Sequence, residues 1–438
     1  MKNFLKPLLI IVIFTASIIF LKRYCFKDYN IILKDNNLSV ELKYKGLKCA
    51  VDFTIDEEKN YYIAYKDKIQ LIDKNGRSMN IFSNSNMNIN SIEYYKNKLY
   101  FSSNSSVYTY DLHSKDVVEI IRNLPNFGDY KDSIVRINND YLYVTIGAAT
   151  NSGVVGDDNI WLKTNPFSHD ISPYRITLRG INFDNGTTGA FLSRGSKSIE
   201  GQIIPGHFPG NASIIMYNLQ TGACATYAWG IRNVKGLDFD SRGRMIASVG
   251  GMENRGLRPI KGDTDYIYVI KSKTWYGWPD YSGGDPVNSP RFKDGNNKTV
   301  PFILDNHPTT NPSAPIYVHN NLGTLNSLVV DKKGEIGEPD SVYFYESKEQ
   351  KLYCINPAGL VNEKLKFNDK SKISSIKYIK NQILILDYNE GNMYALGLKN
   401  INKESISTKP ILYFLFIVSI MMIITILKIT VIKSENKK

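Results

Sequence analysis

The sequence has little of the chemistry that characterises disulfide-bonded or metal-finger proteins. It contains four cysteines in 438 residues, Cys25, Cys49, Cys224 and Cys354, and no C-x-x-C pair. This spacing excludes a disulfide framework and a zinc-finger type of site. No small-residue lipobox precedes Cys25, which argues against a lipoprotein anchor.

The sequence also lacks the features of a nucleic-acid-binding protein. Its formal charge is +12 and its pI is near 9.1, but the lysines are spread singly through turns. No basic helix and no aromatic RNA-binding motif accompanies them. The charge therefore predicts a lysine-rich solvated surface, attracted to anionic lipid or wall polymer, and no nucleic-acid partner.

An apolar run near the N-terminus, residues 7–21, has no A-x-A-like cleavage site after it. As a helix it would reach about 22 Å, short of the roughly 30 Å hydrocarbon core. It is bounded by Lys6 on one side and by Lys22 and Arg23 on the other. We expect residues 1–35 to be an uncleaved signal anchor and linker, with a cleaved signal peptide as the alternative.

A second apolar run, residues 410–427, is uncharged and lies between Lys409 and Lys428. Its length and all-round hydrophobicity predict that residues 401–438 form a C-terminal transmembrane helix with a basic tail, although a buried core helix is the alternative. Basic residues at both ends of the chain predict cytoplasmic termini. The intervening residues 36–400 would then be extracytoplasmic and attached to the membrane by both ends.

The middle of the chain has no long amphipathic helical pattern and instead repeats a β-strand unit. Each copy has apolar residues at i and i+2, a polar turn, an apolar strand and a closing aromatic strand. The copies begin near residues 51, 92, 135, 237, 328 and 376. This pattern predicts an all-β, six-bladed β-propeller, with a β-sandwich as the alternative. Residues 147–210 and 250–320 are long insertions, where we expect the functional site.

Four short motifs fall in or beside these insertions. They are residues 142–153 (L-Y-V-T-I-G-A-A-T-N-S-G), 230–233 (G-I-R-N), 236–239 (G-L-D-F) and 276–279 (Y-G-W-P). Their order resembles that of the glucose/sorbosone dehydrogenase family. The resemblance implies a six-bladed propeller that oxidises sugars with pyrroloquinoline quinone (PQQ) and calcium.

The same resemblance implies roles for residues around the G-I-R-N turn. Arg232 and Asn233 would contact PQQ, since a planar guanidinium suits carboxylate or quinone oxygens. Gly251, Asp263 and Asp265 would surround calcium, which prefers hard oxygen ligands. The alternatives are that Arg232 and Asn233 brace a turn between blades and that the two aspartates form an Asx-type turn.

The sequence departs from the family at its catalytic histidine, because Gly128-Asp129 is followed by Tyr130. Tyrosine titrates near 10 and histidine near 6.5, so tyrosine is the poorer general base. His169, beside Asp170, is the other candidate, with a solvated or structural histidine as the favoured alternative because adjacent residues on a strand point apart. The predicted catalytic residues are therefore Tyr130 and His169.

Two functions remain open from the sequence. The first is a membrane-anchored sugar dehydrogenase that oxidises an aldose or polyol with a PQQ-type quinone. The second is a non-catalytic propeller that binds carbohydrate, cell-wall polymer or a protein partner. In either case a ring-stacking surface is expected from Trp161, Trp275, Tyr276 and Trp278.

Overall fold

The computed structural model describes residues 31–399 continuously, together with isolated helical residues at position 15 and between positions 413 and 427. Of the predicted membrane segments, residues 7–21 lie outside the described residues except for position 15, and residues 410–427 are described only in part. Among the described residues, no helix has both the length and the apolarity that a membrane crossing needs. The chain divides into residues 33–398 and a unit of the two terminal segments, and the first unit is described below by itself.

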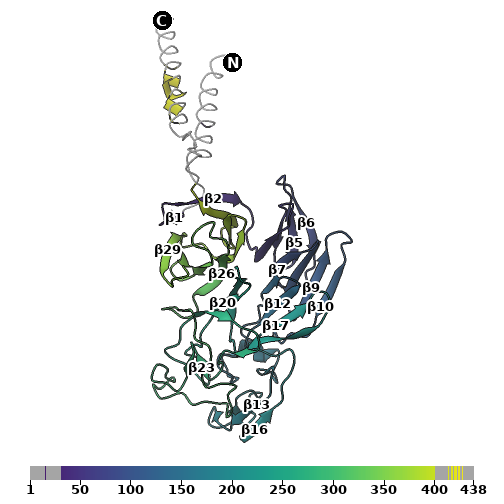
Figure 1. The fold of residues 1–438 in the computed structure, drawn as a ribbon, viewed down its shortest axis with the longest axis vertical. Helices are drawn as coiled ribbons and strands as arrows, with labels where there is room; N and C mark the ends of the chain where they lie inside the picture. Colours follow the sequence, from purple (N-terminus) through teal and green to yellow (C-terminus); the bar gives the residue numbers. More distant parts are fainter. Residues whose placement is uncertain are drawn as a thin grey trace, which may run out of the picture. The chain divides into compact units, whose positions relative to one another are not determined.

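Residues 33–398 form six antiparallel β-sheets, each the blade of a propeller (Figure 1). The first blade comprises β3 (Asp52–Ile55), β4 (Tyr61–Ala64), β5 (Lys68–Ile72) and β6 (Ser78–Ser83). The second comprises β7 (Ile89–Tyr95), β8 (Lys98–Ser103), β9 (Ser106–Asp111) and β10 (Val117–Ile121). The third comprises β11 (Val135–Asn138), β12 (Tyr141–Ile146), β17 (Ser213–Asn218) and β18 (Cys224–Trp229).

The remaining three blades repeat this order. The fourth comprises β19 (Val234–Phe239), β20 (Met245–Val249), β21 (Tyr266–Ile270) and β25 (Tyr317–Val318). The fifth comprises β26 (Leu325–Asp331), β27 (Ser341–Glu346), β28 (Lys351–Ile355) and β29 (Val361–Lys366), with the short β1 (Ile32–Leu33) at its edge. The sixth comprises β30 (Ile373–Ile379), β31 (Gln382–Asp387), β32 (Asn392–Leu398) and β2 (Leu38–Tyr44).

Strands from the two ends of this unit close the ring. β2 pairs antiparallel with β32, so the outer strand of the sixth blade comes from the start of the chain. The inner strands contact one another in the cyclic order β3, β7, β11, β19, β26, β30 and back to β3. The predicted six-bladed propeller is therefore confirmed. Closure protects the sheet edges and buries both faces of every blade.

Charged side chains on the inner strands hold the ring together. The fully buried Asp52 carboxylate accepts hydrogen bonds from the hydroxyls of Ser91 (2.8 Å) and Ser375 (2.6 Å). Arg136 lies 3.4 Å from it and Lys377 lies 3.6 Å from it. The four partners belong to three other blades, so this carboxylate joins sheets that are distant in sequence.

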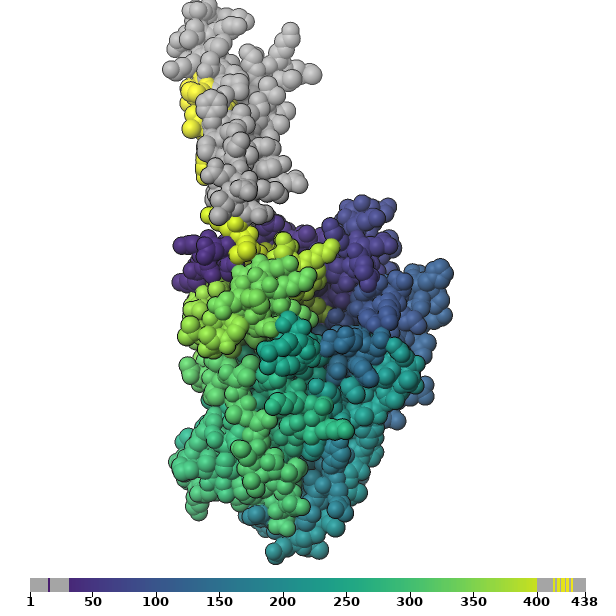
Figure 2. Space-filling view, viewed as in Figure 1, coloured from purple at the N-terminus to yellow at the C-terminus, as the bar shows by residue number. Residues whose placement is uncertain are grey.

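The two long insertions fold together. The first contains the 3-10 helix η1 (Ile160–Lys163), β13 (Ile176–Arg179), β14 (Asn182–Phe183), β15 (Thr188–Gly189) and β16 (Glu200–Ile204), and the second contains β22 (Thr274–Trp275), β23 (Tyr281–Ser282) and β24 (Asp285–Pro286). β22 runs parallel to β18, and Leu178 of the first insertion bridges to Leu304 of the second. β13, β16 and β23 therefore gather at one end of the propeller (Figure 1), and Figure 2 shows the two insertions as one continuous mass there.

Candidate functional site

A cluster of polar side chains surrounds Arg232, where the two insertions meet the blades. The arginine follows β18 and is only 4% exposed. Its Nε donates to the carbonyl of Asn151 (3.0 Å), and its Nη2 donates to the Asn151 amide oxygen (2.8 Å), to Glu253 (3.0 Å) and to the Tyr130 hydroxyl. The Tyr130 ring lies 4.2 Å from the guanidinium carbon. The structure thus brings the predicted Tyr130 and Arg232 together.

Two glycines allow Tyr130 to reach this position. A Cβ on Gly128 would lie 2.2 Å from the Cα of Ala149, and a Cβ on Gly147 would lie 2.1 Å from the carbonyl oxygen of Tyr130. The segment before β11 and the loop after β12 therefore cross at backbone contact, which only glycine permits. The Asp129 N–H donates to the Ala149 carbonyl (3.0 Å) at this crossing.

A second guanidinium, that of Arg255, extends the cluster toward solvent. It donates to Asp129 (2.7 Å) and to the Tyr130 hydroxyl (2.8 Å), and it also pairs with Glu253 and Asp158. Neither Glu253 nor Arg255 is among the site residues predicted from the sequence. Their only sequence signal is an Arg- and Gly-rich turn after β20.

The electrostatics of the cluster disfavour proton transfer by Tyr130. Burial raises the pKa of its hydroxyl to about 12, although the positive charge of Arg232 opposes the shift. Burial also raises the pKa of Glu253, but Arg232 and Arg255 outweigh it and bring that pKa down to about 2. At neutral pH the tyrosine therefore keeps its proton and the glutamate is ionised, so neither is a strong base.

An open cleft of about 920 Å³ adjoins this cluster over the second and third blades. Asp129 and Arg255 belong to both the cleft and the cluster. The cleft wall is rich in side-chain amides, contributed by Asn88, Asn90, Asn104, Asn126 and Asn165. Phe127 and the half-buried Trp161 also line it, with ring centroids 5.4 Å apart in an edge-to-face arrangement. The predicted stacking residue Trp161 therefore does line a cleft.

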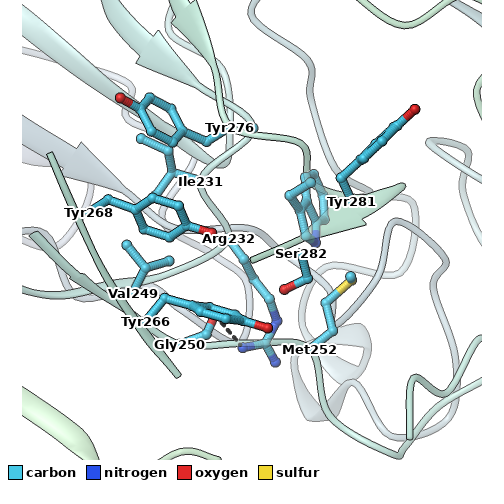
Figure 3. A pocket seen from close by; sticks show the side chains of 12 residues that line it. Ile231, Arg232, Val249, Gly250, Met252, Tyr266, Tyr268, Tyr276, Tyr281 and Ser282 are labelled. Atoms are coloured by element: carbon cyan, nitrogen blue, oxygen red, sulfur yellow. Dashed lines mark hydrogen bonds between the residues drawn. The ribbon is translucent and has the colours of Figure 1, made fainter. Parts of the chain in front are cut away.

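The space directly behind Arg232 is much smaller. Figure 3 shows the side chain passing Tyr266 toward Gly250, whose carbonyl accepts a hydrogen bond from Nη1 at 3.5 Å. The cavity lined by these residues holds about 20 Å³. That volume admits a single water molecule and no ring-shaped ligand.

The calcium prediction does not fit the side chains that the structure presents. Asp265 accepts hydrogen bonds from the N–H groups of Gly251 (3.2 Å), Gly323 (2.9 Å), Thr324 (2.7 Å) and Leu325 (2.9 Å). Four donors saturate this carboxylate, so it serves to tie the start of β26 to the fourth blade.

Asp263 is occupied in the same way. It accepts from the N–H of Met252 (2.6 Å), the N–H of Thr264 (2.8 Å) and the hydroxyl of Tyr266 (2.5 Å). Burial raises its pKa, which disfavours the ionised form that calcium needs. Within the described part of the chain no three His, Cys, Asp or Glu side chains form a metal-binding group.

Three of the four predicted stacking aromatics are core residues instead. Trp275, Tyr276 and Trp278 are 4%, 3% and 6% exposed. Trp275 stacks on His307 with ring centroids 5.6 Å apart, and the Tyr276 hydroxyl donates to the carbonyl of Val269 (2.8 Å). Prediction of an exposed stacking surface from these three was wrong, because Trp275 and Trp278 pack in the core that the two insertions form, and Tyr276 packs among strand residues of the third and fourth blades.

The second catalytic candidate, His169, is separate from the cluster. Its Nδ1 lies 2.9 Å from the backbone carbonyl of Asp170, and no hydrogen bond within residues 31–399 joins it to Tyr130 or Arg232. The Asp170 carboxylate points elsewhere and accepts from the N–H of Ala149 (2.6 Å) and the hydroxyl of Thr150 (2.5 Å). Asp170 therefore positions the loop after β12, and His169 does not complete an acid–base pair with it.

In this arrangement the two predicted cofactor-binding residues, Arg232 and Asn233, are buried and hydrogen-bonded within the protein. All three nitrogens of Arg232 donate to the chain itself, and Asn233 beside it is 6% exposed. The ionised Glu253 would also repel a carboxylate placed against Arg232. The residues present therefore fit a quinone at Arg232 only if Tyr130 and Glu253 are displaced.

No family model matches the sequence, and no curated protein matches it significantly. Solved structures do share its fold. The PQQ domain of a pyranose dehydrogenase from Coprinopsis cinerea is 11% identical, with a TM-score of 0.56 over 85% of this chain and 98% of that domain. The calcium structure of a Carbohydrate-Active Enzymes Family AA12 protein from Trichoderma reesei is 12% identical, with a TM-score of 0.58 over 85% and 98%.

These neighbours agree with the predicted oxidoreductase class, with its PQQ and with calcium. At 11–12% identity the likeness establishes a shared fold and leaves the chemistry to the site. The resemblance to sugar dehydrogenase propellers is confirmed at the level of that fold.

Proposed function

We propose that this chain is a sugar-binding propeller of the sugar dehydrogenase type, which receives a saccharide in the cleft over the second and third blades. The observation that carries the proposal is the cleft wall, which is lined by five asparagines together with Phe127 and Trp161. Amides donate to and accept from hydroxyl groups, and an aromatic face packs against the C–H face of a sugar ring.

Oxidation of the bound sugar is the enzymatic form of this proposal. The shared fold with a PQQ domain of a pyranose dehydrogenase supports it. When bound, PQQ would accept hydride from the sugar carbon. Among this chain's residues, Asp129 and Arg255 could orient hydroxyl groups at the edge of the cleft, because both line it.

Binding without oxidation is the second candidate, and the closed state of Arg232 favours it. Tyr130 covers the guanidinium and Glu253 neutralises it. Tyrosine also replaces the expected histidine base, and its raised pKa leaves it protonated.

Titration calorimetry on the full-length chain tests the proposal. A panel of neutral mono- and oligosaccharides should give saturable binding, and Trp161→Ala should weaken that binding by about tenfold. Trp161→Phe keeps a ring and should weaken it less. Phe167→Ala is the matched control, because Phe167 is 82% exposed in the same insertion and does not line the cleft. Absence of binding by every saccharide would contradict the proposal.

Titration of PQQ with calcium then separates the two candidates. Saturable PQQ binding that Arg232→Ala abolishes, followed by sugar-dependent reduction of a dye, would establish the enzymatic form. Saccharide binding in the absence of any PQQ binding would establish the non-catalytic form.

We also propose that the propeller is displayed outside the cell and attached to the membrane by both ends of the chain. The apolar runs 7–21 and 410–427 and their basic flanks support this. Protease added to intact cells should degrade the propeller and spare epitope tags on both termini. Protection of the propeller would contradict this topology.

A further inference from the structure

Some charged side chains that line the cleft are paired with an opposite charge and others are not. Lys131 and Lys163 line its wall, and both are exposed. Within residues 31–399 neither lysine forms an ion pair with an acidic side chain. The nearest acid in sequence, Asp132, is itself exposed beside Lys131.

The acids of the cleft, in contrast, each pair with a cation. Asp129 and Asp158 both pair with Arg255. Asp129 also accepts hydrogen bonds from Trp161 Nε1 (2.9 Å) and from the Asn159 amide (3.0 Å). The charged residues that line the cleft are Lys131, Lys163 and Arg255 against Asp129 and Asp158, a net charge of +1, so the cleft presents a positive potential to its ligand.

A third lysine, which does not itself line the cleft, adds to this positive potential by bonding a residue of the wall. The half-buried Lys66 donates from Nζ to the Asn90 amide oxygen at 2.8 Å. This bond turns the Asn90 nitrogen, a donor, away from Lys66. An amide donor backed by an ammonium group suits an acceptor-rich ligand.

The cleft wall also contains one buried hydrogen-bond acceptor that has no partner among the described residues. Asn126 is 8% exposed, and its Nδ2 donates to the carbonyl of Asn104 (3.1 Å) and to Ser133 (2.8 Å). Its Oδ1 has no hydrogen-bond partner among the described residues. Leaving such an atom unpaired costs free energy, which a ligand hydroxyl would recover once a small movement of the side chain exposes the buried oxygen to the cleft.

We infer that the ligand of this cleft is an acidic oligosaccharide, a chain of polyhydroxylated units that carries carboxylate or phosphodiester groups. The hydroxyls would bond Asn126 and the other amides, and the acidic groups would pair with Lys131 and Lys163. A cleft of about 920 Å³ is at the upper end of the roughly 300–1,000 Å³ of single-ligand sites, so it accommodates more than one sugar ring. This inference rests on the proposed saccharide binding and specifies its substrate class.

Titration calorimetry with matched ligands tests it on the full-length chain. The probes are a galacturonic acid oligomer, its fully methyl-esterified form and an oligomer of glycerol phosphate. We expect at least one acidic oligomer to bind roughly tenfold more tightly than the neutral ester at low salt. That preference should shrink when NaCl is raised from about 0.05 to 0.5 M, because the Debye length falls below the charge separation.

Variants that each remove one charge test whether Lys131 and Lys163 cause the preference for acidic oligomers. Lys131→Gln and Lys163→Gln should each weaken binding of the acidic oligomer by roughly threefold to fivefold and leave the neutral ester unchanged. Lys333→Gln is the control, since Lys333 is exposed and follows an inner strand, β26, whereas Lys131 precedes one, so the two lie on opposite faces of the propeller.

The outcomes are distinguishable. Preference for the glycerol phosphate oligomer over galacturonate would identify phosphate as the acidic group and support the inference. Equal binding of acidic and neutral oligomers, with no effect of either lysine variant, would overturn the inference and leave the proposed saccharide binding intact. Failure of every saccharide, neutral and acidic, would overturn both.

Discussion

Two buried carboxylates in this molecule have nearly the same surroundings and opposite titration behaviour. Asp52, between the inner strands, and Asp170, under the loop after β12, are 3% and 1% exposed. Each accepts hydrogen bonds from backbone N–H groups and from hydroxyls. The difference is that Arg136 and Lys377 approach Asp52, whereas Asp170 has no cation beside it among the described residues.

This difference decides which form of each acid the fold favours. Burial raises the pKa of Asp52, but Lys377 and Arg136 outweigh it and bring the pKa down to about 2. Burial raises the pKa of Asp170 to about 7, since the hydrogen bonds from Thr150 and Ala149 compensate only in part. The ordinary value is 3.8 for both.

The consequences for stability have opposite signs. The contribution of Asp52 is present above pH 3.8 and is lost as the pH falls toward 2. The contribution of Asp170 is present below pH 3.8 and is lost as the pH rises toward 7. In this propeller the ionised Asp52 links the blades through cations and hydroxyls, whereas Asp170 serves the loop as a hydrogen-bonding group.

Removal of the Asp52 carboxylate should have the largest effect on the stability of the protein. Asp52→Ala leaves Arg136 and Lys377 buried without a counter-ion, so we expect a loss of about 3–5 kcal/mol in the free energy of unfolding by urea. Asp116→Ala, an exposed carboxylate on a surface turn, is the control. If Asp52→Ala unfolds no more easily than this control, the contacts of Asp52 with Arg136 and Lys377 do not stabilise the ring.

Asp170→Asn tests the unpaired carboxylate. An asparagine oxygen can still accept from Ala149 and its amide can donate to Thr150, so the loop should keep its conformation. We expect the stability of the variant relative to the native chain to rise by about 3 kcal/mol or less between pH 5 and pH 8, because the native chain must ionise a buried group over that range. Parallel pH profiles for the two proteins would contradict the raised pKa.

Arg255→Met should remove the ion pairs with Asp129, Asp158 and Glu253. The loss of stability should be smaller, about 1–2 kcal/mol, because this guanidinium is partly solvated. Its main effect should be on the cleft. Asp129 and Asp158 would become uncompensated, and the acidic oligosaccharide should then bind more weakly than to the native chain. Calorimetry beside a thermal unfolding scan separates these two effects. Unchanged binding would show that the two aspartates do not face the ligand.

Tyr130→Phe should have the smallest effect. It removes the hydroxyl that accepts from Arg232 and Arg255, and it retains the ring over the guanidinium, so we expect a loss of about 1 kcal/mol or less. PQQ titration of this variant sharpens the test of Arg232. If Tyr130→Phe binds PQQ no better than the native chain, the hydroxyl is not what closes the site.

Local patterns predicted the fold well. The expected copy near residue 135 is β11, which begins at Val135, and the copy near 237 is β19, which begins at Val234. The turn after Phe239 is closed by a hydrogen bond from the Gly243 N–H to the Asp240 carbonyl (3.0 Å). Alternating apolar residues and glycine turns act over a few residues, so the sequence displays them directly.

The site was predicted less well. The motif that contains Arg232 lies where the insertions meet the blades, but Trp275, Tyr276 and Trp278 are buried and Asp263 and Asp265 are hydrogen-bonded inside the protein. An aromatic beside Gly and Pro has the same local sequence in a pocket and in a core. Only the tertiary packing decides between them: the insertions enclose Trp275 and Trp278, and the third and fourth blades enclose Tyr276.

The sequence by itself determined the number of blades, the position of the inner strands and the two places where long insertions leave the repeat. These depend on hydrophobic periodicity, which is a local property of the chain. The tertiary structure alone decided the partners of each charge: Asp52 meets Lys377 because the ring closes, and Arg255 meets Asp129 because the insertions fold onto the third blade. The energy of a buried charge depends on burial and distance, and both are set by contacts between segments far apart in the chain.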